Sequence, residues 1–327
     1  MFGPSHTAEL RYNQHNEEQS INLIYIHLNL VLNYNEYTDS DVAYRLVVCY
    51  SDYITGRAKS TTPTLTHVIP SQGKGRVTAV ASVGDEVFVA RFNSQHVEVY
   101  DAVTLALQRR LAVPELGEQV YGVAVCSDNK CLYASDYGHD SIHRMQLTAN
   151  NEAKKWSVAS RPAGLSVNKG HNLIVACYGA NRLQEYTTHG SLVKEIYLPA
   201  GATSPWHSIQ LSTGDYVVSQ NTSQGMVSVV GVYGQIVHSY GQSDIGRTKC
   251  PKSLAVTEDD DILVADELNN RILSIDRSFY SIQELALFVD GGMHSPRGLC
   301  LDESRGRLYV GEWSTECRVM VFDDVHL

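Results

Sequence analysis

The chain has 327 residues, of which 43% are hydrophobic and 19% are charged, and its formal net charge is −10. This length and composition exclude a disordered or fibrous chain and are typical of a globular protein with one large domain or two modest ones. The acidic balance repels nucleic-acid phosphates at long range, so RNA binding would require a local basic patch.

Residues 1–61 do not share the pattern of the rest of the chain, and we separate them as an N-terminal flank from a domain of residues 62–327. The chain start lacks a basic region followed by an apolar one, which disfavours a secretory signal. The longest apolar stretch, residues 22–33, is far shorter than the roughly 20 residues that a membrane span needs. Seven scattered cysteines favour a reducing compartment. We therefore expect a cytoplasmic protein without a membrane segment.

From residue 78 onward, a short apolar strand recurs six times. Its copies begin at Thr78, Gly122, Gly164, Ser208, Ser253 and Gly298, which are 44, 42, 44, 45 and 45 residues apart. A polar turn rich in Gly, Asp or Asn follows each copy and leads into a second strand, and then come a third and usually a fourth. Four short strands per repeat of this length are typical of propeller blades around a central channel. The sequence predicts an all-β fold, a six-bladed β-propeller.

The sixth repeat ends with its third strand, predicted over residues 318–322, because only five residues follow it. Its blade would therefore have an open edge, which proteins usually cover. Residues 65–69, before the first repeat, form an apolar strand that ends at Pro70, and proline cannot donate to a strand ladder. We predict that this N-terminal strand pairs with the last blade and closes the ring.

The fifth and sixth repeats resemble the NHL repeat, through residues 251–256, 262–266 and 269–272 in the fifth and 296–302 and 306–310 in the sixth. The resemblance implies a propeller like the C-terminal one of tripartite-motif (TRIM-NHL) ubiquitin ligases, where it is the substrate- or RNA-binding end. NHL propellers also occur in stand-alone proteins and in some propeller enzymes.

A ligase of this kind also needs a zinc-binding RING domain. The flank contains Cys49 as its only cysteine, so this chain alone supplies no RING ligand set. A further possibility is that the chain is a fragment of a longer ligase whose RING lies upstream. Within the flank, residues 22–33 and 44–50 are compatible with short strands or with a loosely packed segment.

The aspartate that follows the second strand in NHL repeats is present in two of the six repeats. The residues at this position are Arg91, Asp136, Cys177, Gln220, Asp266 and Glu312. We interpret it as structural, a carboxylate that accepts hydrogen bonds from loop amides or from Arg271.

The loops that lead into the first strand and that join the second and third strands share one face of a propeller. Aromatic and arginine side chains, which are favoured at binding hot spots, are frequent in these loops. We predict a binding face around the channel mouth, formed by Arg76, Tyr121, Tyr137, Arg161, Tyr178, Trp206, His207, Lys252, Arg297 and Trp313. Phe92, His139, Asn221, Glu267 and Glu312 belong to the same loops. The alternative is that some tyrosines cap their own blades and that the basic residues are solvated.

A metal site has weaker support from the sequence than the binding face. Propeller enzymes can bind zinc through histidines at strand starts, but the positions equivalent to His207 hold Tyr121, Ala163, Lys252 and Arg297. We interpret His207 as structural or surface-exposed. Residues Asn221, Glu267 and Glu312 offer oxygen ligands for calcium without a blade pattern that supports a site. The sequence thus predicts neither a metal nor a cofactor.

Two other groups are interpreted as ordinary structure. Residues 259–261, three consecutive aspartates, lie in a predicted turn and are expected to be solvated. Cys126 and Cys131 flank a predicted turn without a second cysteine pair, so we expect strand cysteines rather than a metal site.

The sequence favours a non-enzymatic binding or scaffold module that presents one propeller face to a protein partner. RNA binding by the same face is the first alternative, through Arg76, Arg161, Lys252 and Arg297, although the net charge opposes it. A metal-dependent propeller hydrolase or lyase is the second. Replacing Trp206 and Arg297 together is expected to abolish partner binding and leave the fold intact.

Overall fold

Short runs of β-branched and aromatic residues form the strands of this protein. The computed structural model describes residues 63–71, 75–148, 152–222, 225–241, 247–287 and 289–325. The predicted flank, residues 1–61, lies outside the described residues. Contacts along the chain separate residues 61–327, which include every described strand, from residues 1–60.

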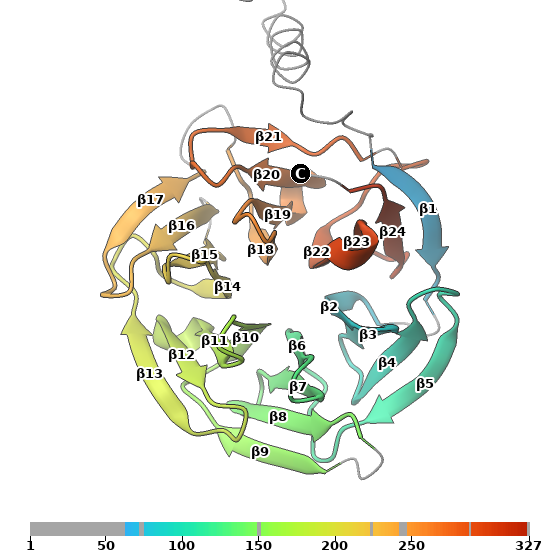
Figure 1. Cartoon of the computed structure of the whole chain (residues 1–327), viewed down its shortest axis with the longest axis horizontal. Helices are drawn as coiled ribbons and strands as arrows, with labels where there is room; N and C mark the ends of the chain where they lie inside the picture. Colours follow the sequence, from blue (N-terminus) through green and yellow to red (C-terminus); the bar gives the residue numbers. More distant parts are fainter. Residues whose placement is uncertain are drawn as a thin grey trace, which may run out of the picture. The chain divides into compact units, whose positions relative to one another are not determined.

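The described strands form six four-stranded antiparallel sheets arranged as blades around a central channel (Figure 1). Each blade begins with an inner strand that lines the channel. The inner strands of blades 1 to 6 are β2 (Val77–Val83), β6 (Val123–Cys126), β10 (Pro162–Val167), β14 (Pro205–Gln210), β18 (Pro251–Val256) and β22 (Pro296–Asp302). The six-bladed β-propeller predicted from the repeat is confirmed.

The other strands of each blade follow outward in chain order. The second strands are β3 (Glu86–Arg91), β7 (Cys131–Asp136), β11 (Leu173–Cys177), β15 (Tyr216–Gln220), β19 (Ile262–Asp266) and β23 (Arg307–Glu312). The third strands are β4 (His96–Asp101), β8 (Ser141–Gln146), β12 (Arg182–Tyr186), β16 (Met226–Val230), β20 (Arg271–Ile275) and β24 (Val319–Asp323). The outer strands are β5 (Leu107–Ala112), β9 (Ala153–Ser157), β13 (Leu192–Tyr197), β17 (Ile236–Tyr240), β21 (Ile282–Glu284) and β1 (Thr64–Ile69).

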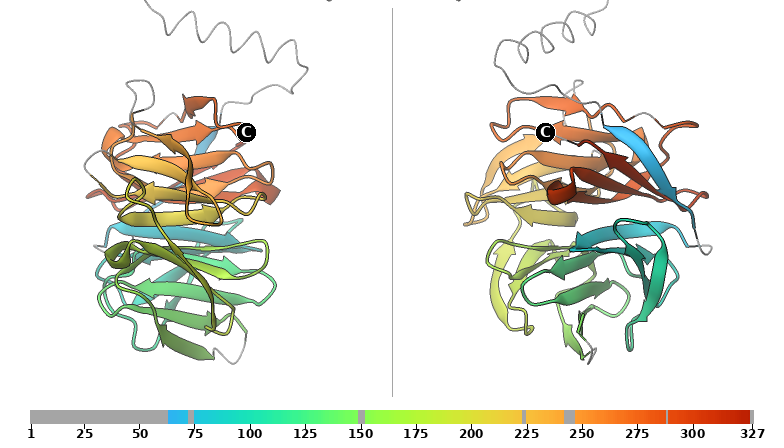
Figure 2. Two further views of the ribbon diagram at one scale, coloured as in Figure 1. Left: turned by 90° about the vertical axis from the view of Figure 1, so that its left-hand side faces the viewer. Right: turned by 45° about the vertical axis from the view of Figure 1, so that its right-hand side comes forward.

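The ring is closed by the strand that precedes the first repeat. β1 pairs antiparallel with β24, with Leu65 opposite Phe322 and Ile69 opposite Val319. Figure 2 shows this first strand lying along the outside of the last blade. The predicted closure is therefore confirmed, and the edge of β24 is covered.

The apolar core lies between the blades. Six clusters of buried side chains occur among the described residues, and each joins two neighbouring blades. Its largest members include four fully buried tyrosines, Tyr100, Tyr133, Tyr216 and Tyr309. Because every blade packs on two neighbours, the inner strands are held at a fixed distance from the channel axis.

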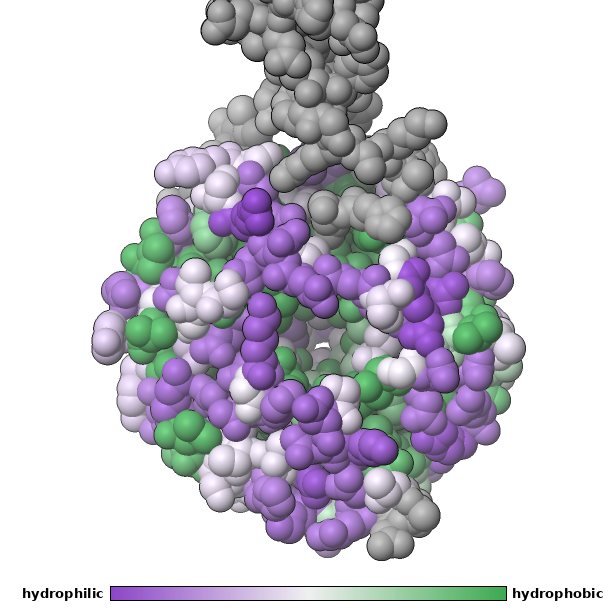
Figure 3. All heavy atoms as spheres, in the orientation of Figure 1, coloured by the Kyte–Doolittle hydropathy of each residue, from purple (hydrophilic) through white to green (hydrophobic). Residues whose placement is uncertain are grey.

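Helical structure is limited in the described residues to three single turns, η1 (Tyr178–Ala180), η2 (Glu267–Asn269) and η3 (Glu303–Arg305). None of the helices in the described part of the chain is long and apolar enough to span a membrane. Figure 3 shows a hollow at the centre of the ring, bordered largely by hydrophilic residues on the face in view.

The acidic residues that end second strands have the structural role expected of them. Asp266 is fully buried and accepts hydrogen bonds from the Lys249 backbone N–H at 2.7 Å and from Arg271 Nε at 3.0 Å. Glu312, also fully buried, accepts from the His294 backbone N–H at 2.7 Å. These carboxylates therefore hold the two loops of one face together in blades 5 and 6.

The two groups interpreted as ordinary structure also have defined contacts. Asp260 accepts hydrogen bonds from the backbone N–H of Ser212, at 3.0 and 3.1 Å, and so ties the turn of blade 5 to blade 4. Cys126 and Cys131 face each other across β6 and β7 as free, buried thiols.

Candidate binding site at the channel mouth

The repeat brings two sets of equivalent residues to one end of the channel. The first set stands at the start of the inner strands and comprises Val77, Tyr121, Ala163, His207, Lys252 and Arg297. The second set directly follows the second strands and comprises Phe92, Tyr137, Tyr178, Asn221, Glu267 and Trp313. Propeller geometry fixes these positions but not their side chains, so the chemistry of this end is particular to this chain.

Six rings from these loops and strand starts form one continuous aromatic cluster. Its members are Phe92, Tyr121, Tyr137, Tyr178, Trp206 and Trp313. Tyr121 is central, because its ring centroid lies 5.0 Å from that of Tyr137 and 5.2 Å from that of Trp206. Both pairs are edge-to-face, which is a favourable geometry for aromatic rings. Burial raises the pKa of Tyr121, while Arg297 partly opposes this.

Arg297 is enclosed by three rings of this cluster. Its guanidinium carbon lies 3.9 Å from the ring centroid of Trp313, 4.8 Å from that of Trp206 and 5.4 Å from that of Tyr121. The residue is only 7% exposed, and its Nε has no hydrogen-bond partner among the described residues. Burial lowers the pKa of Arg297, so its surroundings disfavour the charge that it carries.

Lys252 lies beside Arg297 on the neighbouring blade, and its positive charge is partly compensated by nearby groups. Its Nζ donates a hydrogen bond to Asn221 Oδ1 at 3.0 Å and lies 3.7 Å from Glu267 Oε2. It also lies 4.0 Å from the ring centroid of Trp206. Burial, followed by the nearby Arg297 charge, lowers the pKa of Lys252.

Two further arginines lie at the rim of the mouth and are exposed. The guanidinium carbon of Arg76 is 5.3 Å from the ring centroid of Trp313, and that of Arg161 is 6.0 Å from the ring centroid of Tyr137. Distances of this size are typical of weak cation–π contacts at exposed sites. The rim is thus cationic, while the rings beneath it are partly covered by their neighbours.

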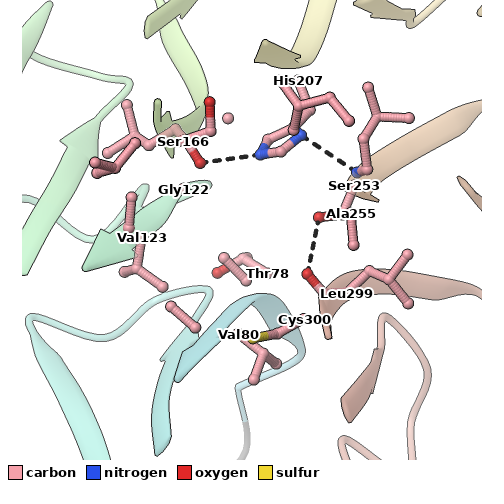
Figure 4. A pocket seen from close by; sticks show the side chains of 18 of the residues that line it. Thr78, Val80, Gly122, Val123, Ser166, His207, Ser253, Ala255, Leu299 and Cys300 are labelled. Atoms are coloured by element: carbon pink, nitrogen blue, oxygen red, sulfur yellow. Dashed lines mark hydrogen bonds between the residues drawn. The ribbon is translucent and has the colours of Figure 1, made fainter. Parts of the chain in front are cut away.

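Below the aromatic cluster, the inner strands of all six blades enclose a cavity of about 250 Å³. Tyr121, Trp206 and Arg297 line its end at the mouth. Most of the wall is made of small and aliphatic residues, and Figure 4 labels several of them around the cavity, among them Val80, Ala255 and Leu299.

His207 belongs to the wall of this cavity and has a structural role. Its Nε2 lies 2.9 Å from the Leu165 carbonyl oxygen, and its Nδ1 accepts a hydrogen bond from the Leu254 N–H at 3.2 Å. Figure 4 shows these two bonds linking the histidine to the blades on either side. Burial lowers the pKa of His207 to about 4, which keeps the ring neutral near pH 7.

Nine of the ten predicted face residues thus come together, and His207 stands apart from them. Among the nine, Trp206, Lys252 and Arg297 are buried rather than displayed. Whether the group forms a binding face stays a prediction. The double replacement of Trp206 and Arg297 is a poor test of it, because removing a buried ring would also disturb the fold.

Phe92, Asn221 and Glu267, which the sequence placed in the same loops but not among the ten predicted binding residues, also join the site. Their signal in the sequence is positional, since each directly follows a second strand. Among the described residues, no group of three or more His, Cys, Asp or Glu side chains is arranged to hold a metal ion.

No family model matches the sequence, and no curated protein matches it. Among solved structures, the chain is similar to a streptogramin B lyase, with 14% identity, coverage of 79% of this chain and 96% of that chain, and a TM-score of 0.58. Virginiamycin B lyase from Staphylococcus aureus is 13% identical, with coverage of 79% and 98% and a TM-score of 0.59. A protein of unknown function from Bacteroides thetaiotaomicron is 12% identical, with coverage of 77% and 70% and a TM-score of 0.62. At these identities the likeness shows the propeller fold alone.

Proposed function

We propose that this chain is an NHL-type propeller that acts as a non-enzymatic binding module and presents its channel mouth to a protein partner. The observation that carries the proposal is the continuous aromatic cluster with four cations at one end of the channel. Tyrosine, tryptophan and arginine are the residues that dominate binding energy at protein interfaces. The resemblance to TRIM-NHL propellers suggests a ubiquitin-ligase-related context for the partner.

Two features of the mouth favour a protein over RNA. Four ring pairs of the cluster pack edge-to-face, among them Tyr121 with Tyr137 and with Trp206, whereas bases stack on open ring faces. Two of the four cations, Lys252 and Arg297, are buried and therefore unavailable to a phosphate backbone that runs over the surface. The net charge of −10 also opposes binding to a polyanion.

The proposal is tested by partner capture with two matched double variants of the full chain. The first, Tyr137→Ser with Arg161→Ser, removes one ring and one rim cation at the mouth. The second, Tyr280→Ser with Arg277→Ser, removes the same residue types from the turn between β20 and β21, at the opposite end of blade 5. Tyr280 is 89% exposed, so its replacement leaves the core intact.

Proteins that bind the wild type and the second variant, but not the first, are the expected result. Equal capture by all three forms would remove the mouth as the recognition surface. Capture that disappears after ribonuclease treatment and falls steeply with salt would instead favour RNA binding. Elemental mass spectrometry after dialysis against metal-free buffer tests the remaining alternative, because one tightly held zinc or calcium ion per chain would favour a propeller hydrolase or lyase.

A further inference from the structure

The partner's chemistry can be inferred from Arg297, the buried cation of the mouth for which the described residues supply no hydrogen-bond acceptor. Resting on the protein-binding function above, we propose that the partner inserts a carboxylate group into the channel mouth, where the N–H groups of Arg297 bind it. Arg297 lines the central cavity, is only 7% exposed and makes no hydrogen bond or ion pair with any described residue. A buried polar group without a partner is rare in folded proteins and is unfavourable until a ligand satisfies it.

A second buried arginine, Arg91, shows how this protein compensates a guanidinium charge within the fold. Arg91, which is 3% exposed, donates from Nε to Glu98 Oε2 at 2.7 Å. Its Nη1 donates to the carbonyl oxygens of Cys317 at 2.6 Å and Gly75 at 3.2 Å. Arg91 Nη2 has no partner among the described residues, but Nε and Nη1 are both satisfied, whereas no described residue accepts a hydrogen bond from the Arg297 side chain. This contrast marks Arg297 as a group available to an external acceptor.

The surroundings of Arg297 favour a planar anion. Three ring centroids lie close to the guanidinium carbon, at 3.9 Å for Trp313, 4.8 Å for Trp206 and 5.4 Å for Tyr121. Rings stacked on a guanidinium plane leave its edge of N–H donors for an acceptor, and a carboxylate matches this edge with two parallel hydrogen bonds. Desolvation by the rings strengthens such a pair.

The positive charges of the mouth outnumber its negative charges, which favours binding of a negative group. Lys252, Arg297 and the exposed Arg76 carry three positive charges, and Glu267 is the buried carboxylate beside them. Glu267 lies 3.7 Å from Lys252 Nζ, and no ion pair joins it to Arg297. A phosphate group would be served better by several free cations, but Lys252 is already bound to Asn221. A single carboxylate fits the donors that remain.

The simplest probe is acetate, titrated into the full chain while sodium chloride is adjusted to hold ionic strength constant. The readout is the Nε–H resonance of Arg297 in ¹⁵N-edited NMR spectra, assigned by its loss in the Arg297→Gln variant. We expect a saturable shift with acetate and none with chloride alone. Phosphate is titrated in the same way, and a saturable shift with phosphate but not acetate would overturn the carboxylate assignment.

Three variants make the test specific, with tryptophan fluorescence from Trp206 and Trp313 as a second readout. Arg297→Gln should weaken acetate binding by about tenfold or more, because it removes a charged hydrogen-bond donor. Glu267→Gln should strengthen binding by about fivefold, because it removes a competing negative charge. Lys154→Gln removes an exposed cation on β9, away from the mouth, and should change the affinity by less than about twofold.

The Glu267→Gln result protects the test against misfolding, since a gain of affinity cannot come from a damaged fold. A loss of affinity in this variant, or unchanged affinity in Arg297→Gln, would overturn the proposal. Two short peptides with capped N-termini distinguish the possible sources of the carboxylate. One has an internal glutamate and an amidated C-terminus, and the other has glutamine at that position and a free C-terminal carboxylate. Binding of the first assigns an acidic side chain, binding of the second a chain terminus, and binding of neither contradicts a protein carboxylate.

These results are separable from the capture experiment on the rim residues Tyr137 and Arg161. Capture that depends on the rim, together with no acetate binding, would reject the carboxylate and leave the protein-binding function standing. Acetate binding at Arg297, together with capture that does not depend on the rim, would support the carboxylate site and reject the rim as the protein-binding surface.

Discussion

His207 and Arg297 occupy equivalent positions in blades 4 and 6, yet their side chains differ in how far the fold satisfies their hydrogen bonding. The two ring nitrogens of His207 bridge Leu165 and Leu254 on the flanking blades, so its hydrogen-bonding capacity is filled. Arg297 has a similar low exposure and three aromatic rings beside its guanidinium, but no described residue accepts a hydrogen bond from its side chain. The comparison teaches that the repeat specifies where a side chain sits, while its neighbours decide whether it is structural or available to a ligand.

The largest effect on stability is expected at Gly164, where the wall of the central cavity is most closely packed. A Cβ on this residue would lie 2.7 Å from the backbone oxygen of Trp206 and would collide with the His207 ring. Because a backbone atom cannot move aside easily, Gly164→Ala should lower the free energy of unfolding by about 3 kcal/mol. Urea unfolding measures this.

Gly170→Ala is the matched control, since that turn glycine has the Asn168 side chain as its nearest neighbour, at 3.3 Å, and a φ that other residues can adopt. It should change the free energy of unfolding by less than about 0.5 kcal/mol. An equal loss in both variants would show that His207 is not held by close packing.

The second largest effect is a pH dependence of the free energy of unfolding, which we attribute to the protonation of His207. The folded-state pKa is lowered to about 4 from the ordinary value of 6.5, because burial disfavours the imidazolium. The unfolded chain therefore takes up a proton first as the pH falls. Stability from this group is full above pH 6.5 and is lost as the pH falls toward 4, by up to about 3 kcal/mol.

His207→Gln isolates this contribution, since an amide can donate to Leu165 and accept from Leu254 without titrating. The difference in the free energy of unfolding between wild type and variant should shrink or reverse from pH 7 to pH 4. A difference that is independent of pH would mean that His207 has the same pKa in the folded and unfolded chains, and therefore that the fold does not desolvate it.

The contrast between His207 and Arg297 also shows which features of the structure could be predicted from the sequence. The six blades and the closing pair β1 and β24 were predictable because a repeat of alternating strands admits few other arrangements. The position of Arg297 at the mouth followed from the same repeat. Its burial did not, because Trp206, Trp313 and Tyr121 come from three different blades, and their lateral packing leaves no local pattern in the sequence.

A smaller effect of opposite sign is expected at the mouth. Arg297→Met replaces an unpartnered buried charge by an apolar chain of similar length, and the lowered pKa of Arg297 shows that its surroundings disfavour the charge. Removing an uncompensated charge should raise the free energy of unfolding by about 1 kcal/mol, after the loss of its cation–π contacts. Thermal and urea unfolding at low salt measure it.

Arg91→Met is the control for this prediction, because it leaves Glu98 buried without its partner. That variant should lose about 3 kcal/mol or more. If Arg297→Met is destabilised to the same extent as Arg91→Met, Arg297 is a structural residue and the comparison with His207 fails.

The smallest effect is expected at the rim, where Arg76 is exposed and its guanidinium carbon lies 5.3 Å from the ring centroid of Trp313. An exposed cation–π contact contributes about 0.5 kcal/mol, so Arg76→Ser should leave the unfolding transition nearly unchanged. Arg161→Ser, with a similar contact to Tyr137, should behave alike. A loss above about 1 kcal/mol in either variant would assign the rim arginines to the fold. Unchanged stability combined with lost partner capture would place them in recognition, where the repeat leaves the side chain free to vary.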